Sequence, residues 1–325
     1  MNVLCRLVAC SLVGFLLASC TGGLSGGSLA ERDNGGESYF VVESNSGVVL
    51  SKLSPRSSRP IGELTQVATA VVAFDWSTAT SSSLSTLATV PMEAASLGGG
   101  NPMGLMPGDQ IRLRDALYSM LLGADAVSAQ TVATYVGTEL ARQRGGYGQP
   151  ISIFVTEMNQ LASALGMSGT RFTSPHGLDG TTSTAEDVAR LGVYAMRHPG
   201  LAFYVKQKSR RISFYRGGQA VAFDVSNTNP LVGQGDINGI KAGSTTPAGA
   251  SLLISAERKP IVEKLPGGQS RVTPRRLVIV VLRSLQGESR AMGLREVGWA
   301  QYDQWLASGG SNSAQVREML TVPNP

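Results

Sequence analysis

The chain has 325 residues, of which 42% are hydrophobic and 16% charged, and its formal net charge is +5. This is enough for one folded domain of about 250 to 270 residues with additional segments. The basic residues are spread thinly, with only short pairs such as Arg210–Arg211 and Arg275–Arg276. No basic-aromatic cluster is present, so nucleic-acid binding is not expected. We interpret the charge as surface charge that favours an anionic cell-wall polymer or a membrane surface.

Cysteine and histidine usage excludes several further classes of site. All three cysteines, Cys5, Cys10 and Cys20, lie in the first 20 residues, and the only histidines are His176 and His198. A domain without cysteines beyond residue 20 has neither a disulfide framework nor a thiolate metal site. We therefore expect no metal and no cofactor.

The N-terminus has the pattern of a targeting segment. An apolar run over residues 7 to 18, too short to span a bilayer as a mature helix, ends in Leu-Ala-Ser-Cys at Cys20. This ending resembles a bacterial lipobox, which implies a signal peptide over residues 1–19 and lipidation of Cys20. The alternative is an ordinary signal peptide that ends in cysteine. The Gly- and Ser-rich residues 20–37 predict a flexible tether.

Residues 38–200 predict a hairpin followed by several helices. Two apolar runs flank Ser-Asn-Ser-Gly at residues 44–47, which is typical of a hairpin turn. A helix is expected from about Pro60 to residue 76, with Glu63 and Gln66 side by side on one face because they are three residues apart. Later helices are expected over 111–137 with a break at Gly123, over 151–166, and from a capping box at residues 183–186 to about His198.

The C-terminal half predicts strands and one last helix. Residues 210–216, 219–225, 250–257 and 275–283 are β-rich runs, and residues 259–274 between the last two indicate an extended hairpin loop. An amphipathic helix follows over 288–307, and residues 308–325 form a polar tail. The order of strands, helices, strands and helix predicts an α+β fold, with a mixed sheet and a helical lobe inserted between its early and late strands.

Three stretches resemble one family. Residues 59–70, RPIGELTQVATA, match a family pattern close to RPIASLTKLMTA; residues 154–180 match the stretch around MNAKAKELGMKNTHFVNPHGLD; and residues 224–256 match the NTN…LL…GIKTGYT…AG segment. The family is that of the D-Ala-D-Ala carboxypeptidases, the low-molecular-weight penicillin-binding proteins of peptidase family S11. The resemblance spans residues 38–307 and implies a penicillin-binding/β-lactamase-like fold, with a mainly antiparallel sheet flanked by helices.

The resemblance also locates the family's three catalytic motifs, and each is altered here. In S-x-x-K a serine is the nucleophile and a lysine takes its proton; the equivalent positions are Glu63 and Gln66. In S-x-N the serine and asparagine positions are Ala124 and Ala126. The K-T-G motif, which holds the substrate's terminal carboxylate, reads Lys241-Ala242-Gly243, and we expect the hydroxyls that follow it to point elsewhere.

These substitutions predict a fold that is retained and a chemistry that is lost. The favoured interpretation is a catalytically silent, lipid-anchored envelope protein that binds peptidoglycan stem peptides or scaffolds cell-wall proteins; Thr21 after Cys20 suits the outer membrane. One alternative is an active carboxypeptidase or hydrolase with unrecognised residues, and another is a structural lipoprotein that uses a surface elsewhere. Lys241 either binds an anionic peptide terminus or pairs with Glu63, and we favour the pairing. A triad built on His176 is disfavoured.

Overall fold

The computed structural model describes residues 36–146, 148–310 and 318–325. The chain divides into two units, Met1–Arg32 and Asp33–Pro325, and every described residue belongs to the second. The predicted signal peptide 1–19, the lipidation site Cys20 and nearly all of the predicted tether 20–37 lie outside the described residues.

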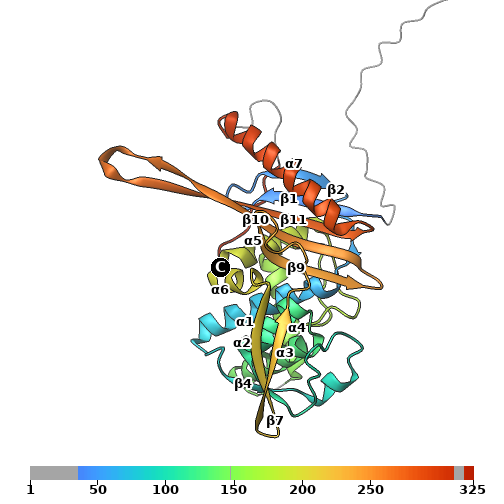
Figure 1. The fold of residues 1–325 in the computed structure, drawn as a ribbon. Helices are drawn as coiled ribbons and strands as arrows, with labels where there is room; N and C mark the ends of the chain where they lie inside the picture. The colour runs from blue at the N-terminus through green and yellow to red at the C-terminus, as the bar shows by residue number, and fades with distance from the viewer. Residues whose placement is uncertain (1–35, 147, 311–317) are drawn as a thin grey trace, which may run out of the picture. The chain divides into compact units, whose positions relative to one another are not determined.

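A five-stranded antiparallel sheet is the largest layer, with the strand order β2-β1-β11-β10-β9. The first two strands come from the start of the domain and the other three from its end, so β1 pairs with residues of β11 that lie about 240 positions later (Figure 1). The bounds are β1 Ser38–Glu43, β2 Val49–Leu53, β9 Ile237–Thr245, β10 Gly249–Lys264 and β11 Ser270–Ser284. The predicted hairpin at residues 44–47 joins β1 to β2.

The central strand β11 is buried on both faces. Leu277, Ile279 and Val281 pack into one apolar cluster and Val278, Val280 and Leu282 into another, because successive side chains of a strand point to opposite faces. The first cluster lies under α7 (Gly287–Ala307), with Trp299 and Tyr302 at its centre. The second cluster lies under α5 (Ala185–Arg197) and continues into the helical lobe. The sheet is therefore enclosed between helices on both faces (Figure 1).

The helical lobe is inserted between β2 and β9 and is built around one buried helix. That helix is α1 (Thr65–Thr80), whose first nine residues are all buried. The other members are α2 Leu113–Gly123, α3 Ala126–Gln143, α4 Pro150–Ala164 and α6 Pro199–Val205. A smaller sheet in the order β4-β5-β7-β8 covers the lobe, with bounds β4 Leu87–Thr89, β5 Gln110–Arg112, β7 Ser209–Arg216 and β8 Gln219–Ser226. The short strands β3 Arg59–Pro60 and β6 Thr182–Ser183 pair with each other, and the 3-10 turns are η1 Gly62–Leu64, η2 Met92–Ser96 and η3 Pro266–Gly268.

This architecture confirms the predicted α+β fold with a mainly antiparallel sheet and an inserted helical lobe. The break at Gly123 is also confirmed, since α2 ends there and α3 begins at Ala126. Two local predictions were wrong. The helix expected from Pro60 begins at Thr65, because Gly62 (φ +54°) opens a separate 3-10 turn before it. The capping box expected at residues 183–186 does not form as predicted. Thr184 caps α5 (Ala185–Arg197) by accepting the Asp187 N–H, and Glu186 pairs with Arg56 and Arg190.

Two C-terminal segments also differ from the sequence prediction. The expected hairpin loop 259–274 is mostly strand, because β10 and β11 stay paired from Ile261–Thr273 out to Lys264–Ser270. It forms an exposed two-stranded arm, the longest hairpin in Figure 1 (orange). Residues 318–325, expected in a polar tail, return to the body, where Leu320 and Val322 join the core and Leu320 donates to the Gly47 carbonyl at 2.7 Å.

Candidate functional site

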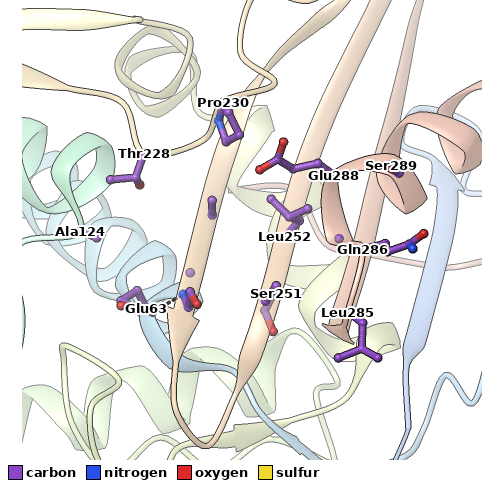
Figure 2. A pocket seen from close by; sticks show the side chains of 15 residues that line it. Glu63, Ala124, Thr228, Pro230, Ser251, Leu252, Leu285, Gln286, Glu288 and Ser289 are labelled. Carbon is purple, nitrogen blue, oxygen red and sulfur yellow. Dashed lines mark hydrogen bonds between the residues drawn. The ribbon is translucent and has the colours of Figure 1, made fainter.

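A pocket of about 760 Å³ lies where η1 approaches β9 and β10, with the start of α7 on its far side. Its lining includes the predicted motif residues Glu63, Ala124, Ala242 and Gly243 (Figure 2). The structure therefore brings one position from each of the three family motifs to a single cavity. Gln66, Ala126 and Lys241 do not line it.

The sequence resemblance predicts Glu63 at the position of the family's nucleophile. Its side chain projects from the 3-10 turn η1, and its carboxylate oxygen Oε2 accepts the backbone N–H of Ser244 on β9 at 2.9 Å (Figure 2). A Cβ atom added at Gly243 would lie 2.9 Å from the same oxygen, so a side chain there would displace the carboxylate. Glycine at 243 is thus what allows Glu63 to bond to the strand edge.

Gln66, at the position of the family's lysine, lies in the protein core. It is fully buried, and neither atom of its side-chain amide has a hydrogen-bond partner among the described residues. An amide cannot take a proton from a hydroxyl at neutral pH. The expectation that Glu63 and Gln66 share one helix face was wrong, because Glu63 belongs to the turn that precedes α1 and faces the pocket.

The residues predicted as the second motif form the turn between α2 and α3. Ala124 ends α2 in a left-handed conformation (φ +56°) and presents only a methyl group to the pocket. Ala126 is fully buried as the first residue of α3. Asp125 between them is the α3 cap, and its carboxylate accepts from Ser119 Oγ at 2.7 Å, Ser128 Oγ at 2.8 Å and Ser128 N at 2.9 Å. These bonds hold the turn that places Ala124 in the pocket wall.

Lys241 is fully buried on β9, and its Nζ atom has no hydrogen-bond partner among the residues the structure describes. Burial lowers the pKa of Lys241 to about 8, and attraction to Glu63 opposes that shift. The predicted ion pair between Lys241 and Glu63 does not form. No ion pair within 4.0 Å joins the two described head groups, because the Glu63 carboxylate bonds to the Ser244 N–H instead.

Four hydroxyl-bearing residues line the pocket: Thr228, Ser244, Ser251 and Ser289. Ser251 is nearly fully buried and is held by backbone bonds to Ala248 and Arg283. Within the described part of the chain, none of the four donates to a histidine, lysine or carboxylate side chain. Ser244 is the residue after Gly243 that lines the pocket, and its backbone N–H is the group bonded to Glu63.

Ser174 and His176 form the one serine–histidine contact seen in the described residues, and they do not line this pocket. Ser174 Oγ lies 3.2 Å from His176 Nδ1, and the same nitrogen accepts the N–H of Leu178 at 3.2 Å. Burial lowers the pKa of His176. Both side chains are buried, and their bonds fix the loop that follows α4.

The pocket's charge comes from two carboxylates. Glu63 and Glu288 line it, and no lysine or arginine does. Across the described residues, no group of three or more histidine, cysteine, aspartate or glutamate side chains is placed to hold a metal ion. Glu288, Gln286 and Leu285 were missed by the sequence reasoning, because they come from the turn before α7 and from its first turn, which carry no motif and reach the pocket only through the fold.

Comparison with known proteins agrees with this architecture. The crystal structure of the Streptomyces K15 DD-transpeptidase superposes with a TM-score of 0.68 at 23% identity, covering 81% of this chain and 96% of the other. Penicillin-binding protein D2 from Listeria monocytogenes, in its ampicillin-bound form, gives 0.59 at 21% identity and covers 84% and 96%. The protein therefore has the penicillin-binding fold.

Sequence comparison places it within that class. The D-alanyl-D-alanine carboxypeptidase model of peptidase family S11 matches residues 28–262, so the chain belongs to this family. D-alanyl-D-alanine endopeptidase of Pseudomonas aeruginosa is 29% identical over 230 residues, which are 69% of this chain and 68% of that protein. The carboxypeptidase DacB2 of Mycobacterium tuberculosis is 28% identical over 268 residues, 81% and 79% of the two chains. For DacC of Escherichia coli, the 29% identical match spans 52% of the relative.

Proposed function

We propose that this protein is a catalytically silent member of the S11 family that is lipid-anchored in the cell envelope. It binds peptidoglycan stem peptides weakly or scaffolds cell-wall proteins. The observation that carries the proposal is Glu63, a carboxylate at the nucleophile's position that is bonded to the Ser244 N–H. A carboxylate that attacked a peptide carbonyl would form a labile anhydride, so this exchange removes the covalent step.

The other motif positions support the same proposal. Acyl transfer by a serine requires a base within hydrogen-bond reach of the hydroxyl. The position of that base is the buried amide of Gln66, and the hydroxyl and amide of the second motif are replaced by the methyl groups of Ala124 and Ala126. Loss of groups from two motifs, inside flanks that keep the family fold, is hard to attribute to a single chance substitution.

Binding of a stem peptide is supported by the cavity that remains. Its volume of about 760 Å³ offers space for an extended peptide, and the edge of β9 beside it, where Ser244 is exposed, offers backbone groups once a ligand displaces the Glu63 carboxylate. The relatives are named for action on D-alanyl-D-alanine. The envelope location rests on this family membership and on the lipobox-like segment that ends at Cys20; no helix in the described residues is long and apolar enough to cross a membrane.

The alternative of an active hydrolase is favoured by the hydroxyl of Ser244, the one pocket serine on the strand that carries the Lys241 motif. Two measurements separate the readings. A pentapeptide ending in D-Ala-D-Ala is incubated with the full chain, and free D-alanine is measured; we expect none, and release above that of buffer would support the enzyme. Calorimetric titration with the same peptide then separates a peptide binder, which gives a saturable signal, from a pure scaffold, which gives none.

Restoring the first motif alone is a sharper test. In the double variant Glu63→Ser, Gln66→Lys, we expect no D-alanine release, because Ala124 and Ala126 still lack the hydroxyl and the amide of the second motif. The matched control adds Ala124→Ser and Ala126→Asn to the same protein. Activity in the double variant would mean that the second motif is not needed, and the account of the lost chemistry would have to be revised.

A further inference from the structure

A second pocket, of about 510 Å³, lies beside the small sheet and shares no lining residue with the first. Four arginines line it: Arg112 at the end of β5, Arg114 in the first turn of α2, and Arg210 and Arg211 on β7. The two pairs are about 100 residues apart in the sequence. The thin spread of basic residues along the chain therefore becomes a concentrated positive site in the fold.

Strand pairing explains why the four arginines meet. β5 pairs with β7 only at Gln110–Tyr215 and Ile111–Phe214, and then the chain turns into α2. The first residues of β7, from Ser209 up to this pairing, run along the start of α2 without a strand on that side. The gap left between the strand edge and the helix is the pocket. Arginines at the end of β5 and at the start of β7 necessarily border it.

The arginines are only partly neutralised. Arg112 donates to the hydroxyl of Tyr215 at 2.7 Å, and Arg211 pairs with the exposed Asp224 at 2.8 Å. Arg114 lies 3.8 Å from Asp115, and among the described side chains no carboxylate lies within 4.0 Å of the Arg210 guanidinium. Asp115 is the single carboxylate among the lining residues, so four arginines and one carboxylate border the pocket.

An aromatic wall holds Arg210 in place. Tyr118 and Tyr204 are stacked with their ring centroids 3.9 Å apart at 12°, and the Arg210 guanidinium lies 5.3 Å from the centroid of Tyr118. Phe203 in the same lining is 47% exposed. Stacked rings are rigid, so the guanidinium loses little further freedom when it binds a ligand. The wall also offers an apolar surface to the uncharged part of a ligand.

We propose that this pocket binds a small phosphate ester that carries a pyrophosphate or two phosphate groups. A guanidinium matches the geometry of phosphate oxygens through two parallel hydrogen bonds, and four of them on two sides of a cavity suit an anion with more than one charged centre. The volume lies in the range of small-molecule sites. The site is separate from the Glu63 pocket, so it stands or falls independently of the proposed function.

The test is calorimetric titration of the full chain with inorganic pyrophosphate, with orthophosphate as the singly phosphorylated comparison. We expect saturable one-site binding of pyrophosphate, weaker binding of orthophosphate, and loss of affinity as salt is raised. Arg210→Gln removes a cation that has no carboxylate partner, and we expect the affinity for pyrophosphate to fall by about tenfold or more, because a charge-assisted contact with the ligand is lost. Arg142→Gln, an equal loss of charge on α3 outside the pocket, is the matched control and should change affinity less than about twofold.

Asp115→Asn should change the affinity for pyrophosphate in the opposite direction. It removes the negative charge that competes with the ligand while it keeps the side-chain shape, so pyrophosphate should bind several-fold more tightly. A folding defect cannot produce this gain. No saturable binding to the unaltered chain at millimolar pyrophosphate, equal losses in Arg210→Gln and Arg142→Gln, or weaker binding in Asp115→Asn would each overturn the proposal.

Discussion

At the scale of single residues, the most unusual side chain is that of Lys241, on the strand β9 beside the candidate site. Its ammonium is fully buried, has no hydrogen-bond partner among the described residues, and lies beyond 4.0 Å from the Glu63 carboxylate. Removal of a charge from water without a close partner is unfavourable. The retained lysine therefore costs folding free energy, which sets it apart from a residue kept for packing alone.

This cost gives a prediction for Lys241→Met. The pKa of Lys241 is about 8 in the folded protein against 10.5 for the free side chain, so below pH 8 the folded state carries the full penalty. Between pH 8 and 10.5 the unfolded chain binds more protons than the folded one, and stability rises with pH. Replacement by methionine should add about 3 kcal/mol at pH 7 and flatten this rise, as measured by urea unfolding at several pH values.

The control for Lys241→Met is Glu63→Gln. The amide oxygen of glutamine can still accept the Ser244 N–H, but it no longer attracts the ammonium, so the pKa of Lys241 should fall further. The rise of stability with pH should then begin at a lower pH than in the unaltered chain. A Lys241→Met protein that is less stable than the unaltered chain at pH 7 would show that the ammonium has a partner that contributes to folding.

At the scale of elements, the arm formed by residues 259–274 is the clearest departure from a compact domain. No residue from Glu257 to Arg276 is buried, although β10 and β11 remain paired over this length. The core therefore gains nothing from these side chains. The pairing register of the arm is set where β10 and β11 lie in the five-stranded sheet. We expect the stability of that sheet and its core not to depend on the arm.

Shortening the arm tests this one-way dependence. Replacement of residues 259–274 by Asn-Gly would join the paired residues Arg258 and Arg275 through a two-residue hairpin turn. The midpoint of thermal unfolding, followed by circular dichroism, should move by less than about 3 °C, since changes to exposed residues are usually worth under about 0.5 kcal/mol. A loss of cooperative unfolding would mean that the arm contributes to the core.

Elements were more predictable from the sequence than the site. The continuous apolar run of β11 and the helix break at Gly123 are local patterns, and both are present in the fold. The start of α1 was misplaced because a 3-10 turn and an α-helix have similar sequence signals over one turn. The bond from Glu63 to Ser244 and the four-arginine pocket join residues 100 to 181 positions apart, and no local pattern encodes such distances.

At the scale of the whole molecule, residues 318–322 near the C-terminus pack against β2 and α5. Val49 donates to the Glu318 carbonyl, Arg190 and Arg197 donate to the carbonyls of Thr321 and Val322, and Leu320 and Val322 are buried. Their polar neighbours hid this role in the sequence. Contacts between the two ends of a chain stabilise only the fully folded state, so they act on the cooperativity of the entire domain.

Leu320→Ala measures how much the packing of this segment contributes to stability. Leu320 is 7% exposed, so its truncation should lower the free energy of unfolding by about 2–4 kcal/mol, as determined by urea denaturation. The adjacent Met319 is 47% exposed, and Met319→Ala should cost less than about 0.5 kcal/mol. Equal effects of the two substitutions would indicate that the segment does not pack as described.

The central claim is that this chain keeps the architecture of a D-alanyl-D-alanine carboxypeptidase without a group able to form a covalent bond to substrate. Intact-protein mass spectrometry after incubation with a fluorescent penicillin tests it most directly, with the variant restored at Glu63, Gln66, Ala124 and Ala126 as the comparison. We predict that the mass of the unaltered chain does not change. A stoichiometric adduct on Ser244, Ser251 or any other hydroxyl would contradict the account.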